Sequence, residues 1–320
     1  MEGVALLEII APGILASVQD LGRRGFGEIG VAPSGAADSY ACRTGNLLVG
    51  NLESSAVVET TLMGFQARFR REAVFAVTGA DMQPRLNGNA IPMWTAVPAA
   101  PGDRLELASA RCGCRSYLAV GGGFGLPAVM GSRATNIGAG FGGCRGRPLQ
   151  AGDLLPGCAP EEYLHCAGRR LPETLRAVYA DAWVLRALPG PQAQHFPEES
   201  RRGFYETVYT VSGASDRTGV RLEGPVLPPG AGTPASILSE GILCGAVQVP
   251  GDGKPIVLMN ETVTGGYRKI AVVIAADLPL LGQLAPGDTV RFQEATMEEA
   301  RALLRGVEAA VDWVRGHFAD

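Results

Sequence analysis

Turn-forming residues divide this 320-residue chain into short segments, and this feature limits its possible folds more than any other. The chain contains 44 glycines and 22 prolines, and the segments between them are rich in β-branched or alternating apolar residues. Many short strands at regular spacing are typical of a β-barrel or β-sandwich rather than of βαβ units. The predicted fold class is therefore mainly β. The segments that carry this prediction are AVFAVTG, DRLELAS, RSYLAVGG, ETVYTVSG, GAVQVPG, PIVLMNE, KIAVVIAA and TVRFQEA.

Helical spacing of apolar residues occurs convincingly in three segments. Residues 36–50 contain an Asp-Ser start at positions 38 and 39, and residues 172–185 open with a Pro-Glu pair that suits a first helical turn. The C-terminal segment 296–318 offers Thr296 as an N-cap and Glu299 three residues later, which is the spacing of a capping box. We therefore predict a few helices, one of them at the C-terminus.

Two sequence patterns occur once in each half of the chain and in the same order. SVQDLGRRGFGEIG (17–30) is similar to VSGASDRTGVRLEG (211–224), and PGDRLEL (101–107) is similar to PGDTVRF (286–292). A single Gly-Asp turn would mean little, because such turns recur in any β-rich protein. Two patterns in the same order favour two related β-barrels. The predicted domains are an N-terminal barrel over 1–158, a helical connection over 159–183, a C-terminal barrel over 184–295 and a C-terminal helix over 296–320.

The charge distribution and hydropathy exclude two classes of partner. The formal net charge is −4, the arginines are scattered, and aromatic residues make up only 6% of the chain, so nucleic acid is not an expected partner. No apolar run approaches the roughly 20 residues that span a bilayer. We therefore expect no membrane association and predict a soluble, cytoplasmic protein.

The cysteines and histidines do not have the spacing of a metal site. Seven cysteines without a secretory signal are expected to be reduced thiols. Cys112 and Cys114 form a CGC pair, but the histidines, at positions 165, 195 and 317, stand far apart. A zinc site needs more ligands at workable spacing, so no metal is predicted.

A glycine-rich loop with acidic and basic residues spans residues 19–38. Asp20 and Arg23 lie among glycines that allow close backbone approach, so the loop could hold a carboxylate or phosphate on arginine and backbone N–H groups. The alternative is an internal ion pair between Asp20 and Arg23 that stabilises a turn. A second glycine-rich segment, 119–149, adds Arg133 and Thr135 as candidate anion ligands or as parts of a packed connection.

The second half of the chain supplies further candidates. Arg217 repeats the acid–guanidinium pattern, and Glu240 precedes an apolar run that could bury it, raise its pKa and make it a base. The alternative for Glu240 is an exposed carboxylate at a strand end. The chain's two lysines, Lys254 and Lys269, flank a Thr-Gly-Gly-Tyr turn; we expect Lys254 to be exposed and Lys269 to carry chemistry.

Several long motifs together resemble those of the family called allophanate hydrolase subunit 2, or KipA. They are SVQDLGRRGFGEIGVAPSGAAD, NLLVGN with VVETTLMG, GSRAT followed by GRPLQAGD, and the stretch from SDRTGVRLEG to APGDTVRF. The resemblance covers about residues 6–300. That family includes the C subunit of bacterial ATP-dependent 5-oxoprolinase and half of the carboxyltransferase domain of urea carboxylase.

The resemblance implies two cyclophilin-like β-barrels and a heteromeric complex with a KipI-like B subunit. In 5-oxoprolinase the activity is completed by a LamB/YcsF-like A subunit, and the complex opens 5-oxo-L-proline to L-glutamate at the expense of ATP. One alternative is a biotin-dependent carboxyltransferase subunit that uses carboxybiotin on a separate carrier and a urea-like or amide acceptor. Another is a non-enzymatic KipA-type regulator that binds a KipI-like kinase inhibitor. The tract MNETVTGG is closer to the urea carboxylase version of the motif, so the acceptor stays open.

The proposed roles of individual residues follow from their chemistry and from these motif positions. Arginine forks can neutralise a carboxylate or phosphoryl oxygen, amide and hydroxyl groups can orient an amide substrate, and a lysine supplies a compact charge. The candidate catalytic residues are Glu240, Lys269 and Arg217. The candidate substrate-binding residues are Asp20, Arg23, Arg133, Thr135, Gln248, Thr264 and Tyr267.

Overall fold

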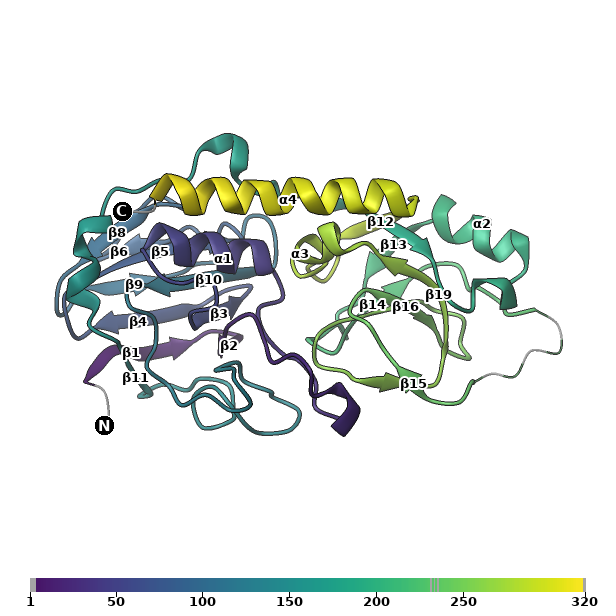
Figure 1. The fold of residues 1–320 in the computed structure, drawn as a ribbon, viewed down its shortest axis with the longest axis horizontal. Helices are drawn as coiled ribbons and strands as arrows, with labels where there is room; N and C mark the ends of the chain where they lie inside the picture. The colour runs from purple at the N-terminus through teal and green to yellow at the C-terminus, as the bar shows by residue number, and fades with distance from the viewer. Residues whose placement is uncertain (1–3, 231, 233, 235, 319–320) are drawn as a thin grey trace. The chain divides into compact units, whose positions relative to one another are not determined.

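The computed structural model describes residues 4–230, 232, 234 and 236–318 and is mainly β, with few helices and a long helix at the C-terminus (Figure 1). The chain forms two compact units. Unit 1 contains Met1–Arg23, Ser34–Tyr179 and Glu308–Asp320, and unit 2 contains Arg24–Pro33 and Ala180–Val307. The predicted fold class is confirmed. The boundaries are more interleaved than a division at 158 and 184, because each unit takes more than one segment of the chain.

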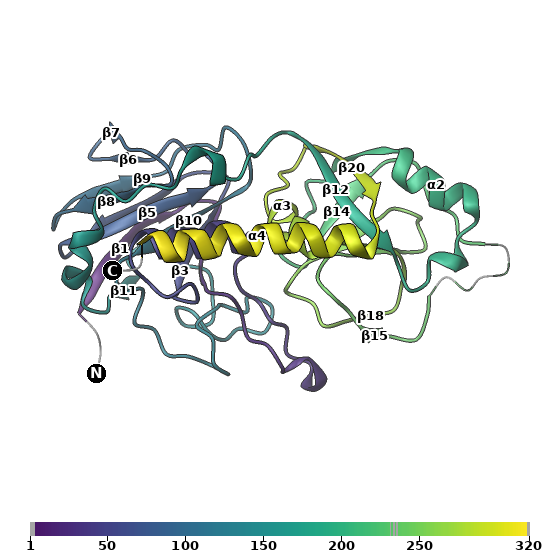
Figure 2. The same cartoon turned by 45° about the horizontal axis from the view of Figure 1, so that its top comes forward.

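Unit 1 has two sheets that enclose one apolar core. The strand orders are β11-β1-β4-β9-β6-β7 and β2-β3-β10-β5-β8. Most of these strands are labelled in Figure 2. Buried side chains of both sheets form one cluster, in which the rings of Phe69 and Phe75 lie 4.9 Å apart. The first sheet contains β1 (Ala5–Pro12), β4 (Phe65–Phe69), β6 (Arg85–Leu86), β7 (Asn89–Ala90), β9 (Arg104–Glu106) and β11 (Leu154–Pro156). The second contains β2 (Leu15–Gln19), β3 (Val57–Thr61), β5 (Ala73–Gly79), β8 (Ala96–Ala99) and β10 (Arg115–Val120).

Helix α1 (Ser39–Leu48) covers the outer face of the second sheet and explains why β5 is buried along its whole length. The helix begins where the sequence predicts, since the Asp38 carboxylate caps it by accepting from the N–H of Ala41. Gly45 permits the close approach, because a Cβ at this position would lie 2.9 Å from the hydroxyl of Thr78. A strand with both faces covered loses its alternating pattern and becomes continuously apolar.

The helix predicted over residues 172–185 is wrong. The structure has only a short 3-10 turn, η3 (Glu173–Leu175), followed by strand β12 (Ala182–Pro189). In β12 the residues Trp183, Leu185 and Ala187 are buried while their neighbours are more exposed, which is strand periodicity. Pairing of β12 with β20 (Thr289–Glu294) overrides the helical spacing. The preceding connection contains the 3-10 segment η2 (Pro160–Cys166).

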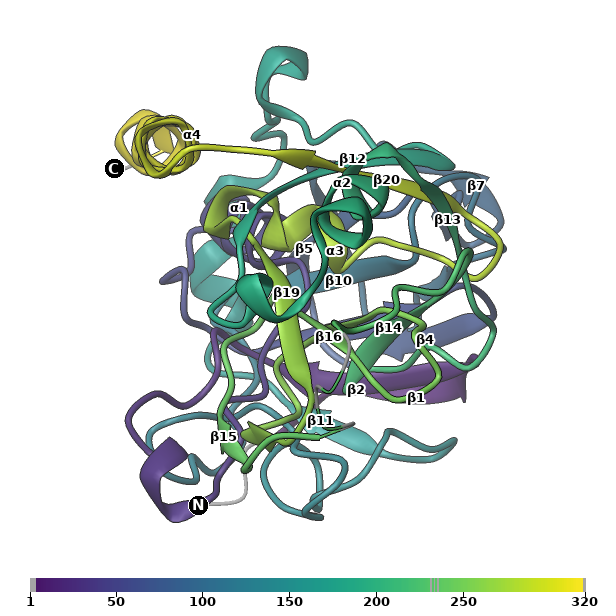
Figure 3. The ribbon, with the colours of Figure 1, turned by 90° about the vertical axis from the view of Figure 1, so that its right-hand side faces the viewer.

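The strands of unit 2 close into a barrel in the order β12-β19-β16-β17-β14-β13-β20 (Figure 3). Helix α2 (Glu198–Glu206) packs on β20, and the ring of Phe204 stacks on that of Phe292 at 4.5 Å. A separate ribbon pairs β15 (Glu240–Gly241) with β18 (Thr264–Gly265). The other elements are η1 (Gly27–Ile29), η4 (Ala193–His195), β13 (Val208–Val211), β14 (Gly219–Glu223), β16 (Ala246–Val249), β17 (Ile256–Leu258), β19 (Arg268–Val273), η5 (Ala275–Asp277), α3 (Leu278–Leu281) and β20 (Thr289–Glu294).

The repeated Gly-Asp turns have the same hydrogen bonds in both units. The carboxylate of Asp103 accepts from the N–H three residues earlier, and the carboxylate of Asp288 does the same. The glycine before each aspartate has φ above +90° and donates its N–H to a strand residue, Phe69 in unit 1 and Val211 in unit 2. The N–H of that strand residue donates in turn to the carbonyl of the aspartate. The sequence repeat therefore corresponds to a repeated structural turn.

Helix α4 (Met297–Phe318) begins with the predicted capping box. The N–H of Glu299 donates to the Thr296 hydroxyl at 3.2 Å, and the Thr296 N–H donates to the Glu299 carboxylate at 2.7 Å. The last part of α4 belongs to unit 1, where Arg43 makes a bidentate ion pair with Glu308 and Arg315 pairs with Glu53. These ion pairs join the C-terminal segment to α1 and the loop that follows it.

Candidate functional site

In unit 2 a buried lysine lies at the start of β19. Lys269 is 4% exposed, and its ammonium group forms an ion pair with the carboxylate of Glu240 in β15. Gln192 joins the two residues, since its side-chain amide donates to Glu240 at 2.8 Å and its carbonyl oxygen accepts from the backbone N–H of Lys269 at 3.2 Å. A buried cation with a single exposed counter-ion is a preformed position for an anionic group.

The structure decides between the two alternatives for Glu240 and excludes the buried one. Its side chain is 45% exposed, and hydrogen bonds from Lys269 and then from Gln192 hold its pKa below the usual value. Burial therefore does not raise the pKa of this carboxyl group, and Glu240 stays ionised at neutral pH as the counter-ion of Lys269. The exposed strand-end alternative describes its environment correctly.

Three further predicted residues gather near Lys269. Gln248 in β16 lies opposite Lys269 in the strand pairing and is 4% exposed. The amide of Gln248 donates to the backbone carbonyl of Tyr267 at 3.5 Å, and a Cβ at Gly265 would lie 2.4 Å from it. Thr264 lies in β18, and the side chain of Tyr267 is 41% exposed. Gln248 therefore contributes a buried amide next to the lysine, while Thr264 and Tyr267 belong to the ribbon and the turn after it.

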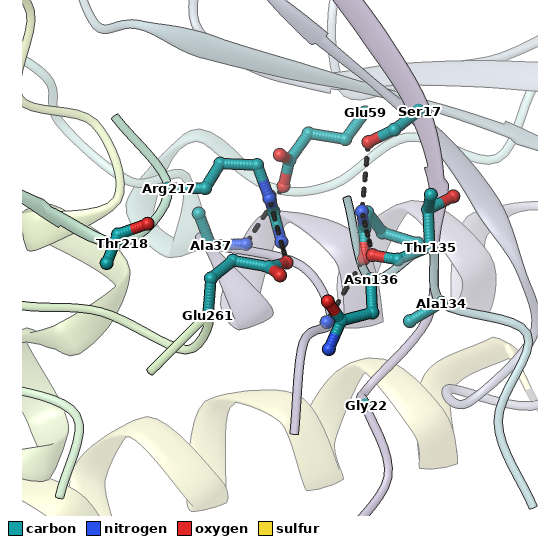
Figure 4. Close-up of polar contacts among 12 residues, drawn as sticks. Ser17, Gly22, Ala37, Glu59, Ala134, Thr135, Asn136, Arg217, Thr218 and Glu261 are labelled. Carbon is teal, nitrogen blue, oxygen red and sulfur yellow. Dashed lines mark hydrogen bonds and ion pairs between the residues drawn. The ribbon is translucent and has the colours of Figure 1, made fainter. Parts of the chain in front are cut away.

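Arg217 forms a buried ion pair with a residue that sequence reasoning did not single out. Its guanidinium donates to the Glu261 carboxylate at 3.1 Å, and the two side chains are 6% and 5% exposed (Figure 4). The neighbouring Asp216 accepts from the N–H groups of Thr218 and Gly219, so it organises the turn. The positive charge predicted at Arg217 is therefore already neutralised within unit 2.

In unit 1 the predicted residues organise the two glycine-rich loops. The Asp20 carboxylate accepts from the N–H of Gly22 at 2.8 Å, the hydroxyl of Ser132 at 2.6 Å and the N–H of Arg133 at 2.5 Å. Arg23 is 2% exposed, donates to the carbonyl of Ala134 and lies over the ring of Phe141, 4.8 Å from its centroid. Through these contacts Asp20 and Arg23 stabilise the conformation of the loop 129–143.

The other two predicted binding residues of unit 1 also donate to backbone carbonyls. Arg133 donates through Nε to the carbonyl of Leu126 at 2.7 Å. The Thr135 hydroxyl donates to the carbonyl of Val18 at 2.9 Å. The side-chain amide of Gln19 donates to the carbonyl of Thr135 and to the hydroxyl of Ser17, and its oxygen accepts from the N–H of Gly35. Ser17 and Thr135 are labelled in Figure 4. The structure thus brings Arg133 and Thr135 together with Asp20 and Arg23 in one loop assembly.

A buried carboxylate in β3 escaped the sequence analysis. Glu59 is 2% exposed and accepts from the N–H of Ala37 and the hydroxyl of Tyr117, both at 2.9 Å. Burial, and then the charge of Glu59, raises the pKa of Tyr117 well above its usual value. The sequence signal that could have revealed it is an acidic residue inside the apolar run AVVETT. A carboxylate buried in such a strand needs hydrogen-bond donors around it, as Glu59 has.

Two negative observations concern the described residues only. No group of three or more His, Cys, Asp and Glu side chains there has an arrangement suited to a metal ion. Across the same part of the chain, no helix has both the length and the apolar character needed to cross a bilayer.

Comparison with known proteins gives a consistent set of similarities. A family model described as carboxyltransferase domain, subdomain A and B, matches residues 29–294. The chain is 40% identical over 299 residues to the C subunit of 5-oxoprolinase from Escherichia coli, which covers 92% of this chain and 93% of that protein. It is 37% identical over 311 residues to the protein of the same name from Haemophilus influenzae, with 97% and 98% covered. The crystal structure of K. lactis urea amidolyase matches with a TM-score of 0.92 at 32% identity, covering 100% of this chain and 20% of that chain.

Proposed function

Since the chain belongs to the carboxyltransferase domain, subdomain A and B, family, we propose that it is the C subunit of a 5-oxoprolinase complex. The observation that carries this proposal is the 40% identity to the Escherichia coli C subunit over 93% of that protein's length. Because the similarity extends over the whole of that subunit and not over one domain of a larger enzyme, it favours the same role as a separate subunit of a complex.

In this proposal the complex opens 5-oxo-L-proline to L-glutamate and consumes ATP. This chain binds a KipI-like B subunit, and the assembly is completed in the cytoplasm by a LamB/YcsF-like A subunit. The substrate is a small anionic amide, so its recognition needs a cation for the carboxylate and hydrogen bonds for the lactam. Lys269 and Gln248 supply both from neighbouring strands. Glu240 and Gln192 then hold the lysine until the substrate carboxylate takes over the ion pair.

Reconstitution of the three proteins tests the proposal. We expect L-glutamate release from 5-oxo-L-proline that depends on ATP and on all three chains. Lys269→Met keeps a long apolar side chain in the buried site but removes the charge, so glutamate release should fall about 100-fold or more. Lys254→Met is the matched control, because Lys254 is half-exposed and pairs with Glu223 outside this cluster. Its activity should equal that of the wild type.

Two outcomes would contradict the proposal at different levels. A well-assembled complex that releases no glutamate would exclude the 5-oxoprolinase function and favour a KipA-type regulator that only binds its partner. Full activity of Lys269→Met would be compatible with the 5-oxoprolinase function but would show that Lys269 takes no part in the reaction. Size-exclusion chromatography of each variant complex separates loss of assembly from loss of activity.

A second candidate function is supported by the match to urea amidolyase along the whole chain. In that case the chain is one part of a carboxyltransferase, and carboxybiotin on a separate carrier replaces ATP as the reactant. Incubation with a carboxylated biotin carrier and urea would then produce carboxylated urea, measured as transfer of ¹⁴C from the carrier. Lack of transfer together with ATP-dependent glutamate release would exclude it.

A further inference from the structure

A second polar site in unit 2 lies beside the short turn η4. A cavity of about 740 Å³ is lined there by described residues that include Gln194, His195, Phe196, Ser236, Ile237 and Arg268. Lys269 and Glu240 are not among the described residues that line it. The cavity is therefore separate from the ion pair described above, although Arg268 and Lys269 are adjacent in the chain.

Arg268 is the unusual residue in this cavity. It is 2% exposed, and its guanidinium donates through Nη2 to the backbone carbonyl of Pro234. Its Nε is buried and has no hydrogen-bond partner within the described part of the chain. A guanidinium has five N–H donors and keeps its charge at all physiological pH values. Among the described residues, its hydrogen-bond partner is therefore one neutral carbonyl, and the Nε donor is left unused.

Lys269, the next residue, has a carboxylate counter-ion of the kind that Arg268 lacks among the described residues. Lys269 is equally buried, but Glu240 neutralises it. No carboxylate of the described residues forms an ion pair with Arg268. A buried charge without a counter-ion is costly, and the usual solutions are an ion pair or a bound ion. The free volume beside Arg268 is large enough to admit a small ligand.

We propose that Arg268, together with His195 in the cavity wall, binds the oxyanion of a small organic acid or phosphate compound. The guanidinium supplies charge-assisted hydrogen bonds to two oxygen atoms, and the imidazole of His195 supplies another polar contact from a separate chain segment. Phe196 and Ile237 offer apolar surface for the rest of the ligand. This site does not depend on the reaction proposed above, because it uses none of the same side chains.

Calorimetric titration of the isolated full-length chain tests the proposal, with inorganic phosphate and L-glutamate as probes. We expect at least one of them to bind the wild type, and Arg268→Gln to weaken that binding about 10-fold or more, as expected for loss of charge-assisted hydrogen bonds. Arg221→Gln removes an exposed arginine of β14 and is the matched control, with unchanged affinity. Lys269→Met should also bind normally, which separates this site from the proposed substrate site.

The pattern of binding identifies the oxyanion. Binding of phosphate alone assigns the site to a phosphoryl group, and binding of glutamate alone assigns it to a carboxylate. No binding of either probe to the wild type, or equal affinity in Arg268→Gln, overturns the proposal. If circular dichroism shows that Arg268→Gln does not fold, Arg268→Lys replaces it, since lysine keeps the charge but loses the planar fork. Unchanged affinity in both Arg268→Lys and His195→Ala would then overturn the proposal.

Discussion

Three of the buried cations among the described residues are stabilised in different ways. Lys269 has a half-exposed counter-ion, Arg217 has a buried one, and Arg23 donates to the backbone carbonyls of Val129 and Ala134 and lies over an aromatic ring. For the two ion pairs, the position of the counter-ion has a consequence. A counter-ion in solvent can be displaced by a ligand at modest cost, whereas a counter-ion buried with its partner resists displacement because separating the pair would leave a charge in the interior.

Asp153 gives a prediction about pH at this scale. It lies in a Gly-Asp turn, is 7% exposed and accepts two hydrogen bonds from Arg147, each at 2.8 Å. The Arg147 side chain holds the pKa of Asp153 below its usual value. Its contribution to stability is therefore complete above the pKa of the unfolded carboxyl, about 3.9, and is lost as pH falls through the lower folded value.

We therefore expect Asp153→Asn to lower the free energy of unfolding by about 1–3 kcal/mol at pH 7. The difference from the wild type should shrink below about pH 4, where the carboxylate of the wild type becomes protonated. Urea denaturation at several pH values measures it. Asp252→Asn, in an exposed turn, is the control and should match the wild type throughout. A difference for Asp153→Asn that does not change with pH would contradict the assigned ion pair.

At the scale of elements, the sequence predicts a helix start correctly where a side chain forms a hydrogen bond with a backbone group a few residues away. The caps at Asp38 and Thr296 fix the starts of α1 and α4, and both are visible in the sequence. The helix prediction for residues 172–185 fails because part of this segment pairs as a strand with residues more than 100 positions away in the sequence. Helix propensity is weak, and tertiary packing decides such cases.

The capping box of α4 provides a second prediction. Thr296→Ala removes the hydroxyl that accepts from the Glu299 N–H and donates to the Glu299 carboxylate. Loss of such a cap costs about 1 kcal/mol, so the first turn of α4 should exchange its amide hydrogens faster. Hydrogen–deuterium exchange measured on peptides from this turn tests the effect. Glu298→Ala changes the same turn without removing the cap and should leave the exchange rates close to those of the wild type.

At the scale of the whole molecule, neither unit is a continuous stretch of sequence. Unit 1 needs Glu308–Asp320 from the end of the chain, and the partners Glu308 and Arg315 reach Arg43 and Glu53 from there. The domain division predicted from the repeated patterns could not detect this, because one continuous helix contributes residues to both units.

A fragment that ends at Tyr179 tests this interleaving. It retains all strands of unit 1 but lacks the two partners of Arg43 and Glu53 that α4 supplies. We expect faster hydrogen–deuterium exchange in α1 of the fragment than in the full chain. A synthetic peptide of residues 297–320 should restore part of the protection, and a peptide with Glu308→Gln and Arg315→Gln should restore less. Equal exchange in fragment and full chain would show that α4 contributes nothing to unit 1.

The sequence alone determined the features that depend on neighbours along the chain. Gly-Asp turns, helix caps and alternating strands follow from hydrogen bonds within a few residues, so the β class, the internal repeat and the C-terminal helix could all be predicted. Only the tertiary structure decided the environment of each charged side chain. Burial and exposure were both open for Glu240 and the structure shows it exposed, whereas Lys269 and Arg268, adjacent in the chain, are both buried and have different partners. Burial and pKa depend on groups that are distant in sequence, and these meet only when the strands pair.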